Sequence, residues 1–160
     1  MSDLRIGLGV DAHAFADGVV LVLGGVRFDH SHGLAGHSDG DVIAHALTDA
    51  LLGAAGLGDI GSLFPSDDER YRGADSLELL ARAYDDVTAA GYELVNADCI
   101  LIGEEPRIAP RRDEMRDRLA GALGVDRDRV NVRATTTDRL GFTGRREGLG
   151  AEAVALLRRV

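Results

Sequence analysis

The sequence predicts one domain that contains both strands and helices. From Leu4 to Val10, apolar residues alternate with polar residues and glycine, which is the pattern of a strand. From Ile43 to Leu51 the apolar residues recur instead at helical spacing. The chain has 160 residues, of which 45% are hydrophobic, so it is long enough to bury a core of its own. We therefore expect residues 1–160 to fold as a single domain.

The first strand has one apolar face and one face of glycine and polar residues. Because side chains alternate along a strand, Asp11 and His13 project from the same side, two residues apart. Such a pair can offer two ligands to one metal ion. A strand end that fades into a polar loop explains the same two residues, and from them alone it is the slightly preferred interpretation.

A hairpin is predicted between Val19 and Phe28, where two apolar runs flank the pair Gly24-Gly25. His30 and His32 follow in a polar loop. We assign no function to these two histidines, because histidines in exposed loops commonly have none.

A polar turn that contains glycine runs directly into the helical pattern between residues 36 and 53. Asp41 and Asp49 lie four residues on either side of His45, so we expect the three side chains to share a face that points to solvent or to a cleft. An imidazole between two carboxylates is a candidate metal ligand, although a solvated polar face is the commoner explanation. All five histidines lie within the first 45 residues, which directs the search for a metal site to this part of the chain.

The middle of the chain predicts a loop, two helices and a strand. Gly91 and Gly124 follow the two helices, as expected for residues that terminate them. The strand is apolar apart from Asn96 and Asp98, so we expect both of its faces to be covered. The elements are a polar loop over a site at residues 62–72, a helix from about Ser76 to Ala90, a strand from about Glu93 to Ile102 and a helix from about Arg111 to Leu123.

The last part of the chain contains a segment rich in hydroxyl groups, glycine and arginine. A strand marked by Val130 and Val132 leads into residues 135–145, Thr-Thr-Thr-Asp-Arg-Leu-Gly-Phe-Thr-Gly-Arg. Hydroxyl and backbone N–H groups can donate to phosphate oxygens, and arginine adds a charged fork. The segment fits a phosphate pocket and, equally, a threonine-rich strand end with a glycine turn. A short helix is predicted from about Ala151 to Arg159.

Composition and charge exclude several classes of function. The net charge of -9 argues against a nucleic-acid-binding protein. The absence of lysine excludes Schiff-base chemistry and a lysine-bearing phosphate loop, and the single Cys99 excludes an internal disulfide or a cysteine-rich zinc site. No stretch reaches the roughly 20 apolar residues that span a bilayer, and no leader pattern precedes Leu4. We expect a cytoplasmic protein that binds neither nucleic acid nor membrane.

Three motifs, in order along the chain, resemble the 2-C-methyl-D-erythritol 2,4-cyclodiphosphate synthase family. They are Gly9-x-Asp11-x-His13, the run from Gly36 to Gly61 that ends in Asp59-Ile60-Gly61, and the block from Ala134 to Arg145. The resemblance covers essentially the whole chain. It implies the conversion of 4-diphosphocytidyl-2-C-methyl-D-erythritol 2-phosphate to the 2,4-cyclodiphosphate and CMP, in non-mevalonate isoprenoid precursor biosynthesis. It also implies an α+β fold, with a mixed β-sheet covered by helices on one face, assembled as a homotrimer with the sheets around the threefold axis and the active sites at the interfaces.

The resemblance also implies roles for individual residues. Asp11, His13 and His45 match the ligands of one divalent ion, usually zinc. His37 and Thr136 match residues that stabilise the transition state, and Asp138 lies near a second ion, magnesium or manganese. Further substrate contacts are matched by Ser38, Asp59, Ile60, Gly61, Phe64, Pro65, Ser66, Asp67, Asp68, Thr135, Thr137, Phe142 and Arg145. The segment that binds cytidine from an adjacent subunit is matched by Gly103, Glu104, Glu105, Pro106, Arg107, Ile108 and Ala109. Family members commonly have glutamate at Asp138 and aspartate at Ser66.

Two other functions fit parts of the same pattern. In a metal-dependent nucleotide pyrophosphohydrolase the same ions would activate water, although the sequence lacks a carboxylate-rich helix motif for several ions. Its product would be an open-chain bisphosphate instead of a cyclic diphosphate. A non-catalytic nucleotide- or metal-binding trimer is the second alternative. The intact motif residues argue against it, and the zinc content of the protein tests it.

Overall fold

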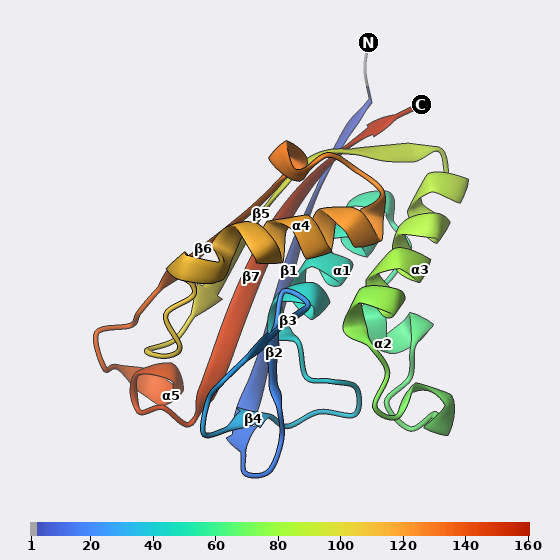
Figure 1. Cartoon of the computed structure of the whole chain (residues 1–160). Helices are drawn as coiled ribbons and strands as arrows, with labels where there is room; N and C mark the ends of the chain where they lie inside the picture. Colours follow the sequence, from blue (N-terminus) through green and yellow to red (C-terminus); the bar gives the residue numbers. More distant parts are fainter. Residues whose placement is uncertain (1–2) are drawn as a thin grey trace.

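The computed structural model describes residues 3–160, so the first two residues of the predicted domain lie outside the described part. Its main feature is a five-stranded sheet with the strand order β4-β1-β7-β5-β6 (Figure 1). β5 and β6 are parallel and the other neighbours are antiparallel, so the sheet is mixed, as expected. The strands are β1 (Leu4–Ala16), β4 (Gly33–Leu34), β5 (Tyr92–Ile102), β6 (Val130–Thr135) and β7 (Gly148–Arg159).

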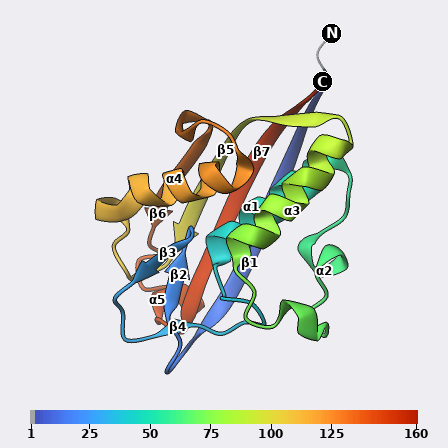
Figure 2. The same cartoon turned by 45° about the vertical axis from the view of Figure 1, so that its right-hand side comes forward.

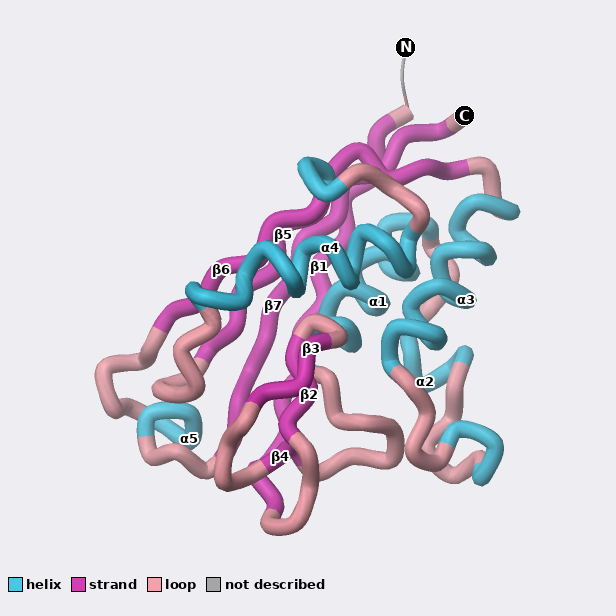
Figure 3. Tube along the Cα trace, viewed as in Figure 1, coloured by secondary structure: helices cyan, strands magenta, loops and turns pink. Residues whose placement is uncertain are grey.

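The predicted hairpin and the three long helices are confirmed. The hairpin forms a separate two-stranded sheet of β2 (Leu21–Leu23) and β3 (Val26–Phe28). The long helices are α1 (Val42–Ala55), α3 (Ser76–Ala89) and α4 (Arg112–Leu123), and Figure 2 shows all three on the same side of the sheet. Short helices α2 (Ile60–Leu63) and α5 (Gly141–Gly144) lie in the loops of the lower half (Figure 3). Single 3-10 turns occur at Glu69–Tyr71, Ala109–Arg111 and Arg127–Arg129.

α1 lies against the centre of the sheet, on β1 and β7. It begins after Asp41, whose side chain accepts a hydrogen bond from the backbone N–H of Ala44. It ends at Gly56, which has the left-handed backbone conformation that glycine adopts without strain. The core on this side of the sheet is built from α1, α3 and α4 packed on the inward side chains of the strands.

The glycine face of β1 is the face that contacts α1. A Cβ atom at Gly7 would lie 2.0 Å from the carbonyl oxygen of Ala50, so the helix occupies the space of a side chain. The apolar face of β1 points the other way and is left uncovered. Its side chains are between 53% and 73% exposed, at Leu4, Ile6, Leu8 and Val10. Four large apolar side chains in a row on an open sheet face are typical of a surface that contacts another protein chain.

The predicted helix from Ala151 to Arg159 is wrong: these residues form most of β7, which lies between β1 and β5. The intrinsic helix propensity of alanine favoured a helix there. In the folded chain Ala151, Ala153 and Ala155 are buried and alternate with residues on the opposite face, which is the period of a strand. Their small side chains leave room for α1, so tertiary packing overrides the local preference.

The strand expected between Glu93 and Ile102 is confirmed as β5, but only one of its faces is fully covered. Leu94, Ala97, Cys99 and Leu101 are buried on the helix side, whereas the residues between them are exposed or partly exposed. A bulge between Leu94 and Asn96 shifts the register with β7. The uncovered face of β5 continues the uncovered face of β1 across the sheet.

Across residues 3–160, no helix combines the length and the apolar composition that crossing a membrane requires.

Candidate active site

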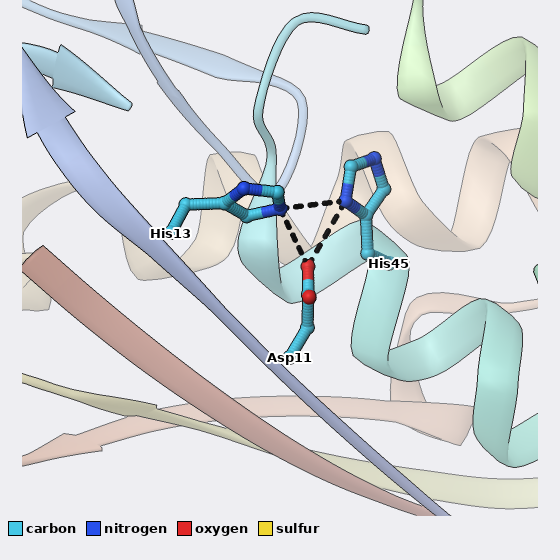
Figure 4. A group of neighbouring side chains, drawn as sticks. All are labelled: Asp11, His13 and His45. Atoms are coloured by element: carbon cyan, nitrogen blue, oxygen red, sulfur yellow. Dashed lines mark hydrogen bonds and ion pairs between the residues drawn. The ribbon is translucent and has the colours of Figure 1, made fainter. Parts of the chain in front are cut away.

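Asp11, His13 and His45 converge at the point where β1 faces the first turn of α1 (Figure 4). The Oδ2 atom of Asp11 lies 2.8 Å from Nε2 of His13 and 3.0 Å from Nδ1 of His45. The two imidazole nitrogens are 3.2 Å apart. Three atoms able to ligate a metal ion thus surround one point, in the grouping that the resemblance to the synthase family implies for these residues.

The electrostatics of this cluster favour a bound cation. Burial opposes ionisation of Asp11, but hydrogen bonds from His13 and His45 outweigh it and hold the pKa of Asp11 at about 2. The hydrogen bond to Asp11 raises the pKa of His13, and partial burial of the ring opposes that rise. Two imidazole nitrogens and one carboxylate form a donor set suited to a divalent transition metal, and three protein ligands leave a position open for substrate. The residues present therefore fit a catalytic metal ion.

The far side of the His45 ring is held by two hydroxyl groups. Nε2 of His45 lies 2.8 Å from Oγ of Ser76 and 3.0 Å from Oγ of Ser38. Ser76 was not identified from the sequence, because it comes from α3, and only the packing of α3 against α1 brings it to the histidine. The one local signal was the Asp75-Ser76 pair at the start of a predicted helix, which local reasoning explains as a helix cap.

The expectation that Asp41 and Asp49 share an open helix face with His45 is wrong for Asp41, whereas Asp49 is partly exposed. Asp41 is fully buried, and its carboxylate accepts hydrogen bonds from the backbone N–H groups of Gly24 and Gly25, at 2.9 and 2.7 Å. Burial raises the pKa of Asp41 to about 6. Asp49 accepts a hydrogen bond from the backbone N–H of Ile60, and burial raises its pKa as well. Both carboxylates thus anchor neighbouring segments to α1.

A hollow of about 200 Å³ opens beside the cluster. Several of the residues expected to contact substrate line it together with the three clustered side chains: His37, Ser38, Ile60, Gly61, Phe64 and Ser66. Asp59, Pro65, Asp67 and Asp68 lie in the same loops but do not line the hollow. Sequence reasoning missed Tyr71 and Leu79, which complete its wall. The ring of Tyr71 packs edge-on against Phe64, with centroids 5.2 Å apart.

His37 is fixed in this hollow by the loop that follows α2. Its Nε2 donates a hydrogen bond to the backbone carbonyl of Asp68, at 2.9 Å. The carboxylate of Asp68 pairs with Arg70 and caps the short turn at Glu69–Tyr71. The loop over residues 62–72 was expected to cover a site, and it does border the hollow through Phe64, Ser66 and Tyr71.

A second hollow, of about 470 Å³, lies at the end of β5 and β6. It joins Thr135 and Thr136 to most of the segment expected to bind cytidine, namely Gly103, Glu104, Pro106, Arg107, Ile108 and Ala109. Glu105 is turned away and lies 3.4 Å from Nε2 of His30. Arg112, which the sequence did not single out, also lines this hollow, and its buried Nε has no hydrogen-bond partner among residues 3–160.

The remaining predicted residues lie near the turn that follows β6. Thr137 and Phe142 line a third hollow, of about 410 Å³, on the far side of β1 from α1. Asp138 is exposed, and its Oδ1 is 3.5 Å from the hydroxyl of Thr136. Arg145 pairs with Glu147 at 3.1 Å. The residues expected to contact phosphate are therefore grouped here, and Asp11 lines both this hollow and the first one.

The expected site is thus divided within one chain. The hollow that contains His37 and the hollow that contains Thr136 share no lining residue. Both hollows open at the surface of the described chain.

Fold and site together define an α+β protein that carries a three-residue group able to hold a metal ion. A sequence profile of the YgbB family matches residues 4–158, and the chain therefore belongs to this family. A protein of Rubrobacter xylanophilus named 2-C-methyl-D-erythritol 2,4-cyclodiphosphate synthase is 59% identical over 162 residues, which cover 99% of this chain and 98% of that protein.

Solved structures agree with the assignment. The bifunctional IspDF from Campylobacter jejuni superposes with a TM-score of 0.96 at 44% identity over 100% of this chain, and the match spans 43% of that longer chain. IspF of Plasmodium falciparum, in a structure described as a CDP complex, superposes with a TM-score of 0.86 at 30% identity and covers 99% of this chain and 98% of its own.

Proposed function

We propose that the chain is a 2-C-methyl-D-erythritol 2,4-cyclodiphosphate synthase. The reaction is an intramolecular attack of the 2-phosphate of 4-diphosphocytidyl-2-C-methyl-D-erythritol 2-phosphate on the β-phosphate, with CMP as leaving group. The observation that carries the proposal is the convergence of Asp11, His13 and His45 beside His37, in a chain that belongs to this family.

We assign one zinc ion to Asp11, His13 and His45, because two nitrogens and one carboxylate with an open position are typical of catalytic zinc. When bound, the ion supplies a Lewis acid that draws negative charge from a phosphate oxygen. Asp138, with the Thr136 hydroxyl 3.5 Å away, is our candidate for holding magnesium or manganese. Magnesium in proteins often has only one or two carboxylate ligands and takes its others from substrate phosphates and water, which suits a lone aspartate.

The attacking group is a phosphate oxygen of the substrate itself, which is already ionised at neutral pH, so the chain needs no strong base. Its task is to fold the substrate so that one phosphate meets the other, and to stabilise the charge that develops. His37, held by the Asp68 carbonyl, and the hydroxyl of Ser38 face the hollow where the erythritol would lie. Phe64 and Tyr71 form an apolar wall that limits access of water, which favours ring closure over hydrolysis.

We further propose that the second hollow binds the cytidine part of the substrate. It contains all but Glu105 of the segment matched to cytidine, and its volume of about 470 Å³ suits a nucleoside. A neighbour of the same fold has been solved as a CDP complex. We expect the two threonines in the hollow to donate to the phosphates that follow the ribose.

We propose a homotrimer in which the sheets surround the threefold axis and each active site lies between two subunits. Two observations support this assembly. The apolar face of β1 is uncovered in the single chain, from Leu4 to Val10. The predicted site is also divided between two hollows of one chain, so that a complete site requires the first hollow of one subunit and the second hollow of its neighbour.

A phosphorus NMR assay tests the reaction. With the diphosphocytidyl substrate, zinc and magnesium, we expect two coupled resonances from a cyclic diphosphate, and CMP in equal amount. Chelation should abolish turnover. An open-chain bisphosphate would instead identify a pyrophosphohydrolase, and nucleotide binding without turnover would identify a binding protein.

Two histidine variants provide the matched comparison for this assay. His45→Ala removes one of the three converging ligands, so we expect it to abolish both zinc binding and turnover. His32→Ala removes a partly exposed histidine paired with Asp17, outside the three hollows, and should retain both. Full turnover with stoichiometric zinc in His45→Ala would contradict the assignment.

A further inference from the structure

Arg112, the first residue of α4, is a cation without a partner in the described part of the chain. Its Nε atom is buried and has no hydrogen-bond partner there. The nearest carboxylates in sequence are engaged by other arginines. Glu114 pairs with Arg111 at 2.9 Å. Asp113 pairs with Arg116 at 3.3 Å. Because arginine stays protonated in proteins, the charge of Arg112 is permanent, and a partly buried guanidinium without acceptors is costly.

The place of Arg112 in the helix adds a second cost. The N-terminal end of a helix carries a partial positive charge, which favours acidic side chains and disfavours cations. Arg112 nevertheless occupies the first position of α4. Residues that break a local rule without compensation inside the chain are expected at functional sites. Both costs favour a role for Arg112 in binding a ligand over a role in folding.

Arg112 lines the second hollow, and one end of that hollow lies at the threonines that end β6. The backbone N–H of Gly103 donates to the carbonyl of Thr135, at 3.0 Å. A carboxylate oxygen of Glu104 accepts from the backbone N–H of Arg139, also at 3.0 Å. Both contacts tie this end to the turn that follows β6, where the residues expected to contact phosphate are grouped. We therefore place the phosphates of a bound nucleotide at this end.

Arg112 lies toward the other end of the hollow. α4 packs on β6, and Arg116, one helical turn after Arg112, donates to the carbonyl of Val130 at the start of that strand, at 2.8 Å. Ile108 and Ala134 line the hollow together with Arg112. Their apolar side chains suit the face of a flat ring. A nucleotide with its phosphates at the threonines thus brings its base to the end that contains Arg112.

The base of a cytidine nucleotide offers what the guanidinium lacks. Cytosine has two adjacent acceptors on its ring edge, O2 and N3. The planar fork of an arginine can donate to two adjacent acceptors at once. Uracil keeps O2 but carries a hydrogen on N3, so that two N–H groups would face each other. A guanidinium on this edge therefore favours cytosine and disfavours uracil.

We propose that Arg112 is a specificity-determining residue, whose guanidinium donates to O2 and N3 of the base and thereby selects cytosine over uracil. The inference rests on the proposed function, in which the second hollow binds cytidine, and it names the residue that reads the base. Arg107 is the competing arginine in the same hollow. It is exposed, so solvent can satisfy its N–H groups, and it carries no cost that a ligand must relieve.

The first test measures the binding of CDP and UDP to the assembled protein by calorimetry, with zinc and magnesium present. We expect the wild type to bind CDP roughly 10- to 100-fold more tightly than UDP, the discrimination typical of one bidentate contact to a base. Arg112→Met should lose most of this preference, mainly through weaker binding of CDP. Unchanged affinity and preference in Arg112→Met would overturn the proposal. An equal loss for CDP, UDP and pyrophosphate would assign Arg112 to the phosphates and would also overturn it.

Arg112→Lys separates charge from geometry. Lysine keeps the positive charge but presents a single ammonium group in place of the planar fork. We expect this variant to bind CDP and UDP with nearly equal affinity. A lysine variant with the full wild-type preference would show that charge alone suffices, which would contradict the fork.

Arg116→Met is the matched control, because it removes an arginine one turn later in the same helix. Arg116 has partners in the chain and does not line the hollow. Its loss should lower the thermal midpoint of the nucleotide-free protein and leave the preference for CDP unchanged. Arg112→Met should instead raise the midpoint, because it removes a partly buried cation without acceptors. A midpoint lowered as far as in Arg116→Met would identify Arg112 as a structural residue and overturn its role in binding.

The same titrations distinguish failure of this inference from failure of the proposed function. A wild type that binds neither nucleotide would overturn the assignment of the second hollow to cytidine, and with it the proposed function. Selective binding of CDP by the wild type that persists in Arg112→Met would overturn only the role of Arg112.

Discussion

Gly9 of β1 lies against the backbone of Ala46 in α1 so closely that a Cβ atom at Gly9 would be 1.8 Å from the Ala46 carbonyl oxygen. Real Cβ atoms essentially never come within 3.0 Å of such an atom. Ala46 follows His45, and Gly9 is two residues before Asp11, so this contact fixes the distance across which the three clustered side chains meet. Glycine is needed at this position to bring helix and strand together.

Gly9→Ala should therefore push α1 away from β1 and weaken the cluster. Overpacking of this kind costs about 1–3 kcal/mol of folding free energy. The atoms that the new Cβ would meet belong to the backbone of α1, which cannot move aside as a flexible side chain can. We expect a lower thermal midpoint and at least a roughly tenfold loss of zinc affinity, because His45 moves away from Asp11 and His13 and the groups that orient its ring move with it. Thermal denaturation and zinc titration measure the two effects.

Gly53→Ala is the control for this substitution. Gly53 lies in α1, and a Cβ there would meet no atom within 4 Å. Alanine in an exposed helical position should stabilise the chain by about 0.5–1 kcal/mol and leave zinc affinity unchanged. If Gly9→Ala were as stable as Gly53→Ala and bound zinc as tightly, the contact between Gly9 and Ala46 would not determine the geometry of the metal site.

Zinc affinity should fall as the pH is lowered, and His13 should dominate the decline. The hydrogen bond to Asp11 raises the pKa of His13 above its ordinary value of 6.5. A proton on His13 competes with the metal, so the apparent affinity is constant above this pKa and falls roughly tenfold per pH unit below it. Asp11 does not contribute in this range, because its pKa is about 2.

Chelator competition over a pH series checks this expectation, with His32→Ala as control. His32 pairs with Asp17 outside the cluster, so its removal should leave the profile unchanged. An affinity that stays flat from neutral pH to well below 6.5 would exclude His13 as a ligand.

Thr136→Ala should slow turnover without unfolding the protein. The side chain is exposed at the edge of the second hollow, so its loss removes little packing. Loss of one preorganised donor to a developing charge lowers kcat by about 10- to 1000-fold. Thr136→Ser keeps the hydroxyl and should retain most of the rate. An unchanged kcat in Thr136→Ala would remove this residue from the mechanism.

Much of the fold could be predicted because its signals are local. Alternation identifies β1, the Gly24-Gly25 pair identifies the hairpin, and helical spacing followed by glycine identifies α4 before Gly124. The grouping of Asp11 and His13 was also local, since both lie on one face of one strand. Placing His45 with them depended on the resemblance to a family, because the contact between β1 and α1 spans over thirty residues of sequence.

The errors arise where contacts between residues far apart in the sequence determine the structure. Ala151 to Ala155 have the composition of a helix, and only pairing on both sides makes them part of a central strand. The carboxylate of Asp41 accepts hydrogen bonds from backbone N–H groups of the β2–β3 hairpin, which is distant from it in the sequence. From the local sequence alone, Asp41 therefore looked like a free neighbour of His45. Ser76 could not be placed near His45 without knowing that α3 packs on α1.

Ile6→Glu should dissociate the proposed trimer. Ile6 is 73% exposed on the uncovered face of β1, so a charge there costs little in an isolated chain but repels its copies around a threefold axis. We expect light scattering to give three times the chain mass of 16.9 kDa for the wild type and a single chain for the variant. Val20→Glu, at an exposed apolar residue outside β1, should remain trimeric. A wild type that elutes as a single chain would exclude the assembly.

Mixing the inactive His45→Ala variant with the slow Thr136→Ala variant tests whether one active site draws on two subunits. His45→Ala removes a ligand from the first hollow of its chain and leaves the second hollow intact, whereas Thr136→Ala removes a hydroxyl group from the second hollow and leaves the first intact. If each site joins the first hollow of one subunit to the second hollow of the next, random trimers from equal amounts of the two variants restore about a quarter of the sites. When the two variants are unfolded and refolded together, the mixture should approach about a quarter of the wild-type activity. The same variants refolded separately should show no such gain. A mixture no more active than the two variants refolded separately would place both halves of the site in one chain.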